Sequence, residues 1–243
     1  MKFENTEVWG FEHSLRGMRN PLNSWHRSDS GTNYDCMNGC REDCPHLNMD
    51  CDEEYCDEFR IGQNDMKLAQ TLIKAGNEHR KFMRQIFVSV DITAPLYWWK
   101  EMDQYRINVT TNSTSTMHRL TPSPITLDCF ETDDYDRDLS LADNLKDDNE
   151  LNHISVFEED VIMILESLRQ KYLETKDKRY WKELIRWLPE SWLQKRTITM
   201  NYENVRNMYF QRRNHKLTEW SESFIKWVEL LPYAEKLIMY EGE

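Results

Sequence analysis

The spacing of apolar residues along the chain predicts a helix-rich protein with at least one buried strand. Apolar residues recur at helical intervals after Asn64 and Asp65, which we expect to cap this helix, and Gly76 follows as a stop signal. The segment Arg84–Asp91 is β-branched and bulky, which favours a strand with a buried face. The predicted helix face consists of Met66, Ala69, Leu72 and Ile73.

Further helices are predicted beyond this strand. Pro95 suits the first turn of a helix over Leu96–Tyr105. Ser155 and Glu158 form a capping box that opens a long amphipathic helix. The apolar face predicted for that helix consists of Val161, Ile162, Leu165, Leu168 and Tyr172. Two or three shorter helices are expected at about Tyr180–Leu188, Tyr202–His215 and Thr218–Leu231. The predicted fold class is therefore α+β, with helices dominating.

Other segments lack such periodicity. Residues 1–30 mix aromatic residues with arginines, which indicates an ordered lead-in. Residues 31–60 form a Cys- and acid-rich insert, and Thr110–Thr116 is a predicted polar loop. Residues 128–150 carry ten acidic residues in an almost core-less stretch, which we interpret as an acidic surface loop because the calcium-loop spacing is absent. No internal repeat is present, and the length of 243 residues fits a single domain over 1–243.

Composition narrows the functional classes. The aromatic content of 12% excludes wholesale disorder, and the net charge of -12 argues against a nucleic-acid partner. A small anionic ligand held by a few arginines remains compatible with that charge. No apolar run approaches the roughly 18 residues of a membrane helix, so no membrane partner is expected. The first residues lack the basic and apolar regions of a secretory signal, and we expect a cytoplasmic protein.

The seven glycines exclude two common nucleotide sites. None of them forms G-x-G-x-x-G or G-x4-G-K-[ST], so a Rossmann site or a P-loop is not expected. A nucleotide would have to be bound by side chains and helix ends.

The cysteines are concentrated in the insert. Without a secretory signal, a metal site or reduced thiols is favoured over disulfides. Four thiolates, or three together with His46, have the donor chemistry for a structural zinc ion, although the spacing departs from the usual C-x2-C pairs. A reduced, variable insert is the alternative. The candidate metal ligands are Cys36, Cys40, Cys44, Cys51 and Cys56.

Two further constellations carry candidate binding residues: the first is suited to a flat, anionic ligand, and the other is a basic polar helix. Residues 78–84, which include His79, and residues 91–106 place basic and aromatic side chains around one strand and one helix start. The other segment carries Asn201, Asn207 and Arg212. Each has a purely structural alternative: the aromatic residues Tyr97, Trp98 and Trp99 as core, His79 as a helix-end partner and the basic helix as surface.

The order and spacing of these segments resemble the flavin-dependent thymidylate synthases. That family's A-P-x-[FY]-x-x-R-Q-x-x-R-H-R is in register with Ala94–Arg106, and its loop S-x-N-E-x-S-x-R-Y resembles Asn112–His118 with one extra residue. Further along, the family has a proline, two asparagines and an arginine at fixed intervals, and Pro189, Asn201, Asn207 and Arg212 have the same spacing. The arginine that precedes the proline is displaced by one position, to Arg186. The similarity covers roughly residues 65–120 and 180–220, and the whole chain is also similar to a divergent, phage-associated branch.

Several departures from the family pattern fall at positions that contact flavin and deoxyuridylate in that family. Only Arg106 of the Arg-His-Arg motif is retained. The replacements are Gln104 and Tyr105 in that motif, Glu101 at the preceding glutamine, Ser113 at the acidic loop position and Met117 at the last loop arginine.

The resemblance implies a thymidylate synthase complementing-protein-like fold with a central antiparallel sheet, and a homotetramer with active sites between subunits. It implies methylation of dUMP to dTMP, with FAD as cofactor and with NADPH and methylenetetrahydrofolate as cosubstrates. The implied substrate-binding residues are Glu101, Asn112, Ser113, Ser115, Arg186 and Arg212, and Arg212 is also the implied catalytic residue. The implied cofactor-binding residues are His79, Gln104, Tyr105, Arg106, Asn201 and Asn207. Two alternatives stay open: a related dUMP hydroxymethylase, and a catalytically inactive nucleotide-binding or assembly protein that retains the fold.

Overall fold

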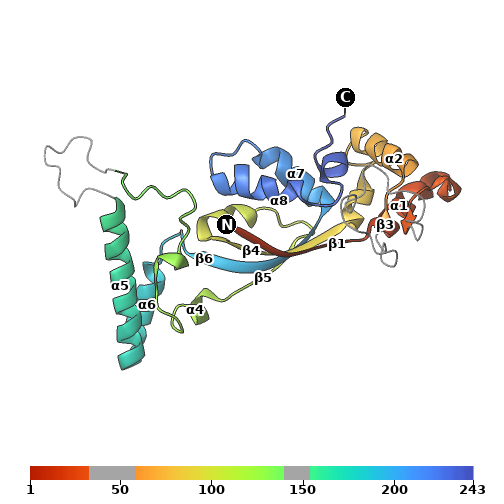
Figure 1. Cartoon of the computed structure of the whole chain (residues 1–243). Helices are drawn as coiled ribbons and strands as arrows, with labels where there is room; N and C mark the ends of the chain where they lie inside the picture. Colours follow the sequence, from red (N-terminus) through yellow and green to blue (C-terminus); the bar gives the residue numbers. More distant parts are fainter. Residues whose placement is uncertain (33–58, 140–153, 243) are drawn as a thin grey trace, which may run out of the picture. The chain divides into compact units, whose positions relative to one another are not determined.

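The computed structural model describes residues 1–32, 59–139 and 154–242 (Figure 1). The chain divides into two compact units. The first comprises Met1–Thr6, Ser89–Thr199 and Asn214–Phe224, and the second comprises Glu7–Val88, Met200–Arg213 and Ile225–Glu243. The described residues mix helices with an antiparallel sheet, so the predicted α+β class is confirmed.

A four-stranded sheet has the strand order β1-β4-β6-β5. Its strands are β1 (Lys2–Trp9), β4 (Phe87–Pro95), β5 (Thr110–Ser113) and β6 (Leu193–Asn201). In β4 alternate side chains are buried (Val88, Val90, Ile92 and Ala94), which is the period of a strand with one face in the core. β5 pairs with β6 in antiparallel register from Thr110 opposite Thr199 to Ser113 opposite Arg196.

The first unit also contains helices α3 (Leu96–Met102), α4 (Thr116–Arg119), α5 (Ile154–Thr175) and α6 (Lys178–Arg186), and the π-helical segment η7 (Glu219–Phe224). Helices α5 and α6 run side by side (Figure 1). A hydrophobic cluster fixes both helices to the chain around β5 and β6. It consists of Leu120, Ile125, Phe130, Leu165, Leu184 and Trp192.

The second unit contains helices α1 (Phe11–Arg19), α2 (Gln63–Lys74), α7 (Tyr202–Arg212) and α8 (Ile225–Glu229). Short 3-10 helices cover Asn20–Leu22, Trp25–Arg27 and Lys81–Gln85, and a π-helical segment covers Ala234–Ile238. A two-stranded antiparallel ladder joins β2 (Gly31–Thr32) to β3 (Phe59–Arg60). This ladder brings the two ends of the Cys-rich insert together, while the five candidate metal ligands lie outside the described residues.

The predicted start of α2 is wrong. Gly62, not Asn64 or Asp65, is the N-cap, and the free amides of the first turn are capped from another segment. The carboxylate of Asp29 accepts hydrogen bonds from the backbone N–H groups of Asn64 and Asp65, at 2.9 and 3.1 Å. A Cβ at position 62 would overlap that carboxylate, so only glycine fits there. The predicted stop is confirmed, since Gly76 has a φ of 103°.

The capping box at Ser155 is also wrong. Helix α5 already includes Ile154, so Ser155 lies within the helix and not at its N-cap. Glu158, the expected second member of the box, instead accepts a hydrogen bond from the hydroxyl of Tyr135 at 3.0 Å. A tertiary partner has replaced the local one.

The polar loop predicted at Thr110–Thr116 is partly a strand, because its β-branched threonines pair with the edge of β6. The predicted strand at Arg84–Asp91 begins later, at Phe87, and extends to Pro95.

The predicted helix at Thr218–Leu231 is divided into η7 and α8. Within the acidic stretch, Phe130 is buried and forms a bridge with Trp192, while residues 140–150 lie outside the described part.

Candidate functional site

The junction of β4 and α3 carries the segment with the most specific sequence pattern. Pro95 ends the strand and is the N-cap of α3, so the residues after it are presented on one short helix. Trp98 and Trp99 are 0% and 1% exposed, which confirms that they are core residues, and the indole of Trp99 donates to the carbonyl of Gln194 at 2.9 Å. The rigid aromatic base positions the polar residues that follow.

The residues at the Arg-His-Arg positions follow the end of α3. Gln104 and Arg106 are exposed, and each is held to the turn by one bond to a backbone carbonyl, at 3.3 Å to Lys100 and 2.8 Å to Asp103. The Arg106 bond uses Nε, so the terminal guanidinium nitrogens point away from that contact. Tyr105 packs its ring edge against Trp220 at 6.2 Å between centroids. This turn therefore presents one guanidinium group on an aromatic support.

Glu101, which stands at the family's glutamine position, is paired with His215. Oε2 of Glu101 lies 3.5 Å from Nε2 of His215, and both side chains are partly exposed. Nδ1 of His215 lies 3.2 Å from the backbone nitrogen of Leu217 and accepts from its N–H. In the neutral ring Nε2 must then carry the proton that faces the carboxylate.

The remaining predicted residues of the first unit occupy two places. Asn112 and Ser113 are exposed on β5, opposite Thr197 and Arg196 of β6, and Ser115 is the N-cap of α4. The structure thus brings these three residues onto one edge strand and the helix start beside it. Arg186 lies at the end of α6, where its guanidinium forms an ion pair with Glu183.

The second unit holds the other predicted residues. Asn201 is 1% exposed and forms a reciprocal capping box with Asn204 at the start of α7. Asn207 is exposed on that helix, and Arg212 is partly exposed at its last turn. His79 is exposed between α2 and the 3-10 helix at Lys81–Gln85. Three of the predicted residues therefore share α7, and His79 belongs to a separate segment.

A cluster that the sequence pattern did not indicate surrounds Tyr97. Its hydroxyl donates to Glu219, with which it makes a very short contact, and lies 3.2 Å from an oxygen of Glu131. Burial and the neighbouring carboxylates raise the pKa of Tyr97, so the phenol stays protonated. Burial, and then the charge of Glu219, raises the pKa of Glu131. The partners are 34 and 122 residues away, so no local pattern could have revealed the cluster.

Replacing Glu131→Gln is expected to raise the melting temperature at pH 7 by roughly 2–4 °C. The amide keeps an acceptor oxygen for Tyr97 but removes the repulsion between two carboxylates. Because the folded pKa of Glu131 is raised, its carboxyl favours folding below its ordinary pKa of 4.5 and loses that contribution as the pH rises. The advantage of the variant should therefore vanish near pH 4, which thermal melts from pH 4 to 8 would measure. An identical gain in the exposed control Glu229→Gln would refute this account.

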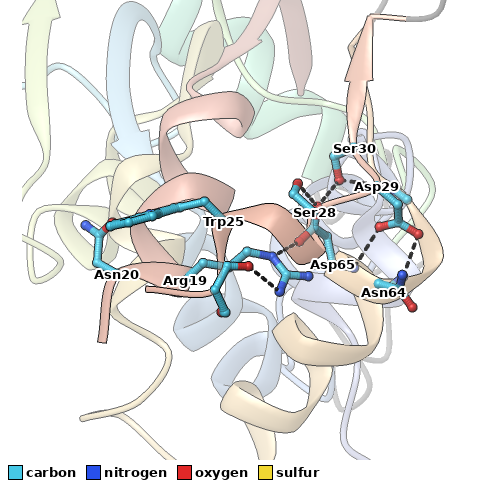
Figure 2. A network of polar contacts seen from close by, with 10 residues as sticks. Arg19, Asn20, Trp25, Ser28, Asp29, Ser30, Asn64 and Asp65 are labelled. Atoms are coloured by element: carbon cyan, nitrogen blue, oxygen red, sulfur yellow. Dashed lines mark hydrogen bonds and ion pairs between the residues drawn. The ribbon is translucent and has the colours of Figure 1, made fainter. Parts of the chain in front are cut away.

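A second polar cluster lies in the other unit, around Asp65, which is 0% exposed (Figure 2). Nε of Arg19 donates to Oδ1 of Asp65 at 2.5 Å, and the hydroxyls of Ser28 and Ser30 donate to Oδ2, also at 2.5 Å. The hydroxyl of Ser30 in turn accepts from the backbone N–H of Gly62 at 2.9 Å. Both oxygens of the buried carboxylate thus accept hydrogen bonds, and the network ties α1 and residues 28–30 to the start of α2.

Among residues 1–32, 59–139 and 154–242, no group of three or more His, Cys, Asp or Glu side chains is arranged to hold a metal ion. The same ranges contain no helix that is long and apolar enough to span a membrane.

Comparison with known proteins gives matches among solved structures only. No protein-family profile matches the chain, and no curated protein matches it. A crystal structure of thymidylate synthase X (ThyX) from Helicobacter pylori with FAD and dUMP matches with a TM-score of 0.60 and 17% identity, covering 100% of both chains. Another crystal structure of the flavin-dependent ThyX from the same organism, also with FAD and dUMP, matches with a TM-score of 0.59 and 15% identity, covering 99% of this chain and 98% of that one. At these identities the likeness establishes the fold, and it confirms the fold predicted from the sequence pattern.

Proposed function

We propose, from the fold that this chain shares with flavin-dependent thymidylate synthases, that it is an enzyme of that kind. It would methylate dUMP to dTMP, with methylenetetrahydrofolate as carbon donor, reduced FAD as hydride donor and NADPH as reductant. The observation that carries the proposal is the match over the full length of both chains, with FAD and dUMP in the matching ThyX crystals. We further propose a homotetramer, as the resemblance implies.

The residues that the resemblance assigns to the cofactor fit FAD in part. FAD carries a diphosphate and a flat ring, which suit exposed guanidinium and amide groups beside aromatic surfaces. Arg106 and Asn207 offer exposed donors of this kind. Gln104 and Tyr105, which precede Arg106, and His79, which follows α2, are also accessible to solvent. Asn201 is 1% exposed and its side-chain oxygen is occupied by the helix cap, so it does not fit direct contact with the cofactor and would act by fixing the start of α7. When bound, FAD would supply the hydride.

The residues proposed for the substrate supply neutral donors and three charged groups. Asn112, Ser113 and Ser115 would hold the nucleotide with neutral donors, and Arg186 would contribute charge if released from Glu183. Arg212 would stabilise negative charge on the pyrimidine carbonyl and N3, where a fixed guanidinium lowers the barrier most effectively. Glu101 would reach the nucleotide through a carboxylate held by His215.

One observation favours the alternatives of a dUMP hydroxymethylase or an inactive nucleotide-binding protein. Two of the three residues at the Arg-His-Arg positions are uncharged, and the retained Arg106 is exposed. An assay for dTMP and hydroxymethyl-dUMP formation separates these alternatives from each other and from the methylating enzyme.

The first test is the visible absorbance spectrum of the purified chain with added FAD, with and without dUMP. We expect a flavin band that persists through gel filtration and shifts when dUMP is added. Replacing Arg106→Gln should weaken FAD binding roughly tenfold, because a charged hydrogen bond to the cofactor would be lost. The exposed Arg119→Gln serves as the control. A chain that binds neither FAD nor dUMP at millimolar concentration would refute the proposal.

A further inference from the structure

An open hollow of about 590 Å³ lies in the second unit, between the outer face of α2 and the 3-10 helices that follow α1. Its volume is within the range of sites for small molecules. Four of its nine lining residues have basic side chains: Arg19, His26, Arg27 and Lys67. Leu22 and Leu68 supply apolar surface. None of the lining residues is among those proposed for FAD or dUMP.

The charge of this hollow is only partly compensated. Arg19 is neutralised by Asp65, but neither Arg27 nor Lys67 forms an ion pair with another residue in the described part of the chain. The lining contains no aspartate or glutamate. In a protein with a net charge of -12, two cations that pair with no described residue give this hollow a locally positive lining.

The floor of the hollow is rigid. Arg19 is 5% exposed, and its guanidinium is fixed by the 2.5 Å bond to Asp65 and a longer bond of 3.4 Å to the carbonyl of Ser24 (Figure 2). Those contacts use Nε and Nη1, so the guanidinium plane is set before any ligand arrives. This part of the lining is therefore already ordered, and binding of a ligand that contacts it does not carry the cost of ordering it.

We propose that this hollow binds a phosphorylated small molecule, with a phosphate held by Arg27 and Lys67 and the rest of the ligand over Leu22 and Leu68. Paired guanidinium and ammonium groups are the side chains that recognise phosphate oxygens most strongly. The hollow is larger than one phosphate requires, which leaves room for an organic group. This site is separate from the proposed active site and does not depend on the proposed function.

The test uses pyrophosphate as the probe and isothermal titration calorimetry on the full chain. We expect the double variant Arg27→Gln/Lys67→Gln to weaken binding at least tenfold. Both positions are exposed and make no ion pair among the described residues, so folding should be unaffected, which circular dichroism verifies. The matched control is Lys178→Gln/Lys182→Gln on α6, which removes the same charge from two exposed positions and should leave binding unchanged. No binding by the unmodified chain, or equal weakening in both double variants, would overturn the proposal.

A competition experiment separates this site from the nucleotide site. With saturating dUMP present, pyrophosphate should still bind with its original affinity, and Arg27→Gln/Lys67→Gln should keep its affinity for dUMP. Displacement of pyrophosphate by dUMP would instead place the hollow within the substrate site and overturn its assignment as a separate one. If the chain binds pyrophosphate but not dUMP or FAD, the proposed function fails while the phosphate site stands.

Discussion

Asp65→Asn is expected to lower the free energy of unfolding by about 3–5 kcal/mol, because it leaves the buried guanidinium of Arg19 without its counter-charge. The amide NH2 of asparagine would replace either Oδ2, which accepts from both Ser28 and Ser30, or Oδ1, which accepts from Arg19. Either both hydroxyls or the guanidinium would lose their acceptor. Urea unfolding followed by circular dichroism measures the change. The exposed Asp128→Asn is the matched control and should change stability by less than about 0.5 kcal/mol. An equal effect of the two substitutions would contradict this role for the ion pair.

The same pair predicts a defined pH dependence. Burial alone would raise the pKa of Asp65, but hydrogen bonds from Ser28, Ser30 and Arg19, together with the charge of Arg19, outweigh it and hold that pKa below its ordinary 3.8. A lowered folded pKa means that the stabilisation is complete above the unfolded pKa and is lost as the pH falls through the folded value. The stability difference between the unmodified chain and Asp65→Asn should therefore be constant near neutrality and shrink below about pH 4.

Arg212→Ala is expected to reduce formation of dTMP by about 10²–10³-fold if the proposed function holds, since one positioned donor at developing charge contributes that much. The side chain is partly exposed at the end of α7, so its removal should leave the fold intact. Arg213 provides a control on the adjacent residue: it is bound to Glu241 and lies over the ring of Phe210.

Steady-state assays with purified variants test this expectation. Arg213→Ala should retain most of the activity, and Arg212→Lys should recover part of it through the retained charge. Equal losses in Arg212→Ala and Arg213→Ala would show that neither arginine has a specific role in the reaction.

Strand β4 was predictable from sequence because its burial follows a strict alternation of apolar side chains. Strand β6 carries the same signal only in its second half, at Ile198 and Met200, and its first half is basic and polar. Strand β5 carries none, since all four of its residues are exposed, and it becomes a strand only by pairing with β6. The pattern of apolar residues along the sequence therefore reveals strands with a face in the core. It misses strands, such as β5, that form only by hydrogen bonding to an adjacent strand.

The candidate site divides in the same way. The helix at Tyr202 was predicted, so the positions of Asn207 and Arg212 on α7 were predictable. The helix after Pro95 was also predicted, but it ends at Met102 and not at Tyr105, so the turn that carries Arg106 was missed. The pairing of Glu101 with His215 and of Arg19 with Asp65 joins residues far apart in the chain, the latter pair 46 residues apart. Such pairings depend on tertiary packing, which a single sequence does not encode in any local pattern.

The contacts around Asp29 and Ser30 also bear on how this protein can vary over evolution. Hydrogen bonds between residues 28–30 and residues 62–65 join the two parts of the chain that flank residues 33–58 (Figure 2). The β2–β3 ladder adds a second connection between them. Because these contacts lie outside residues 33–58, substitutions within that range leave them in place. Substitution of Asp29, Gly62 or Asp65 would instead remove contacts that join the two ends.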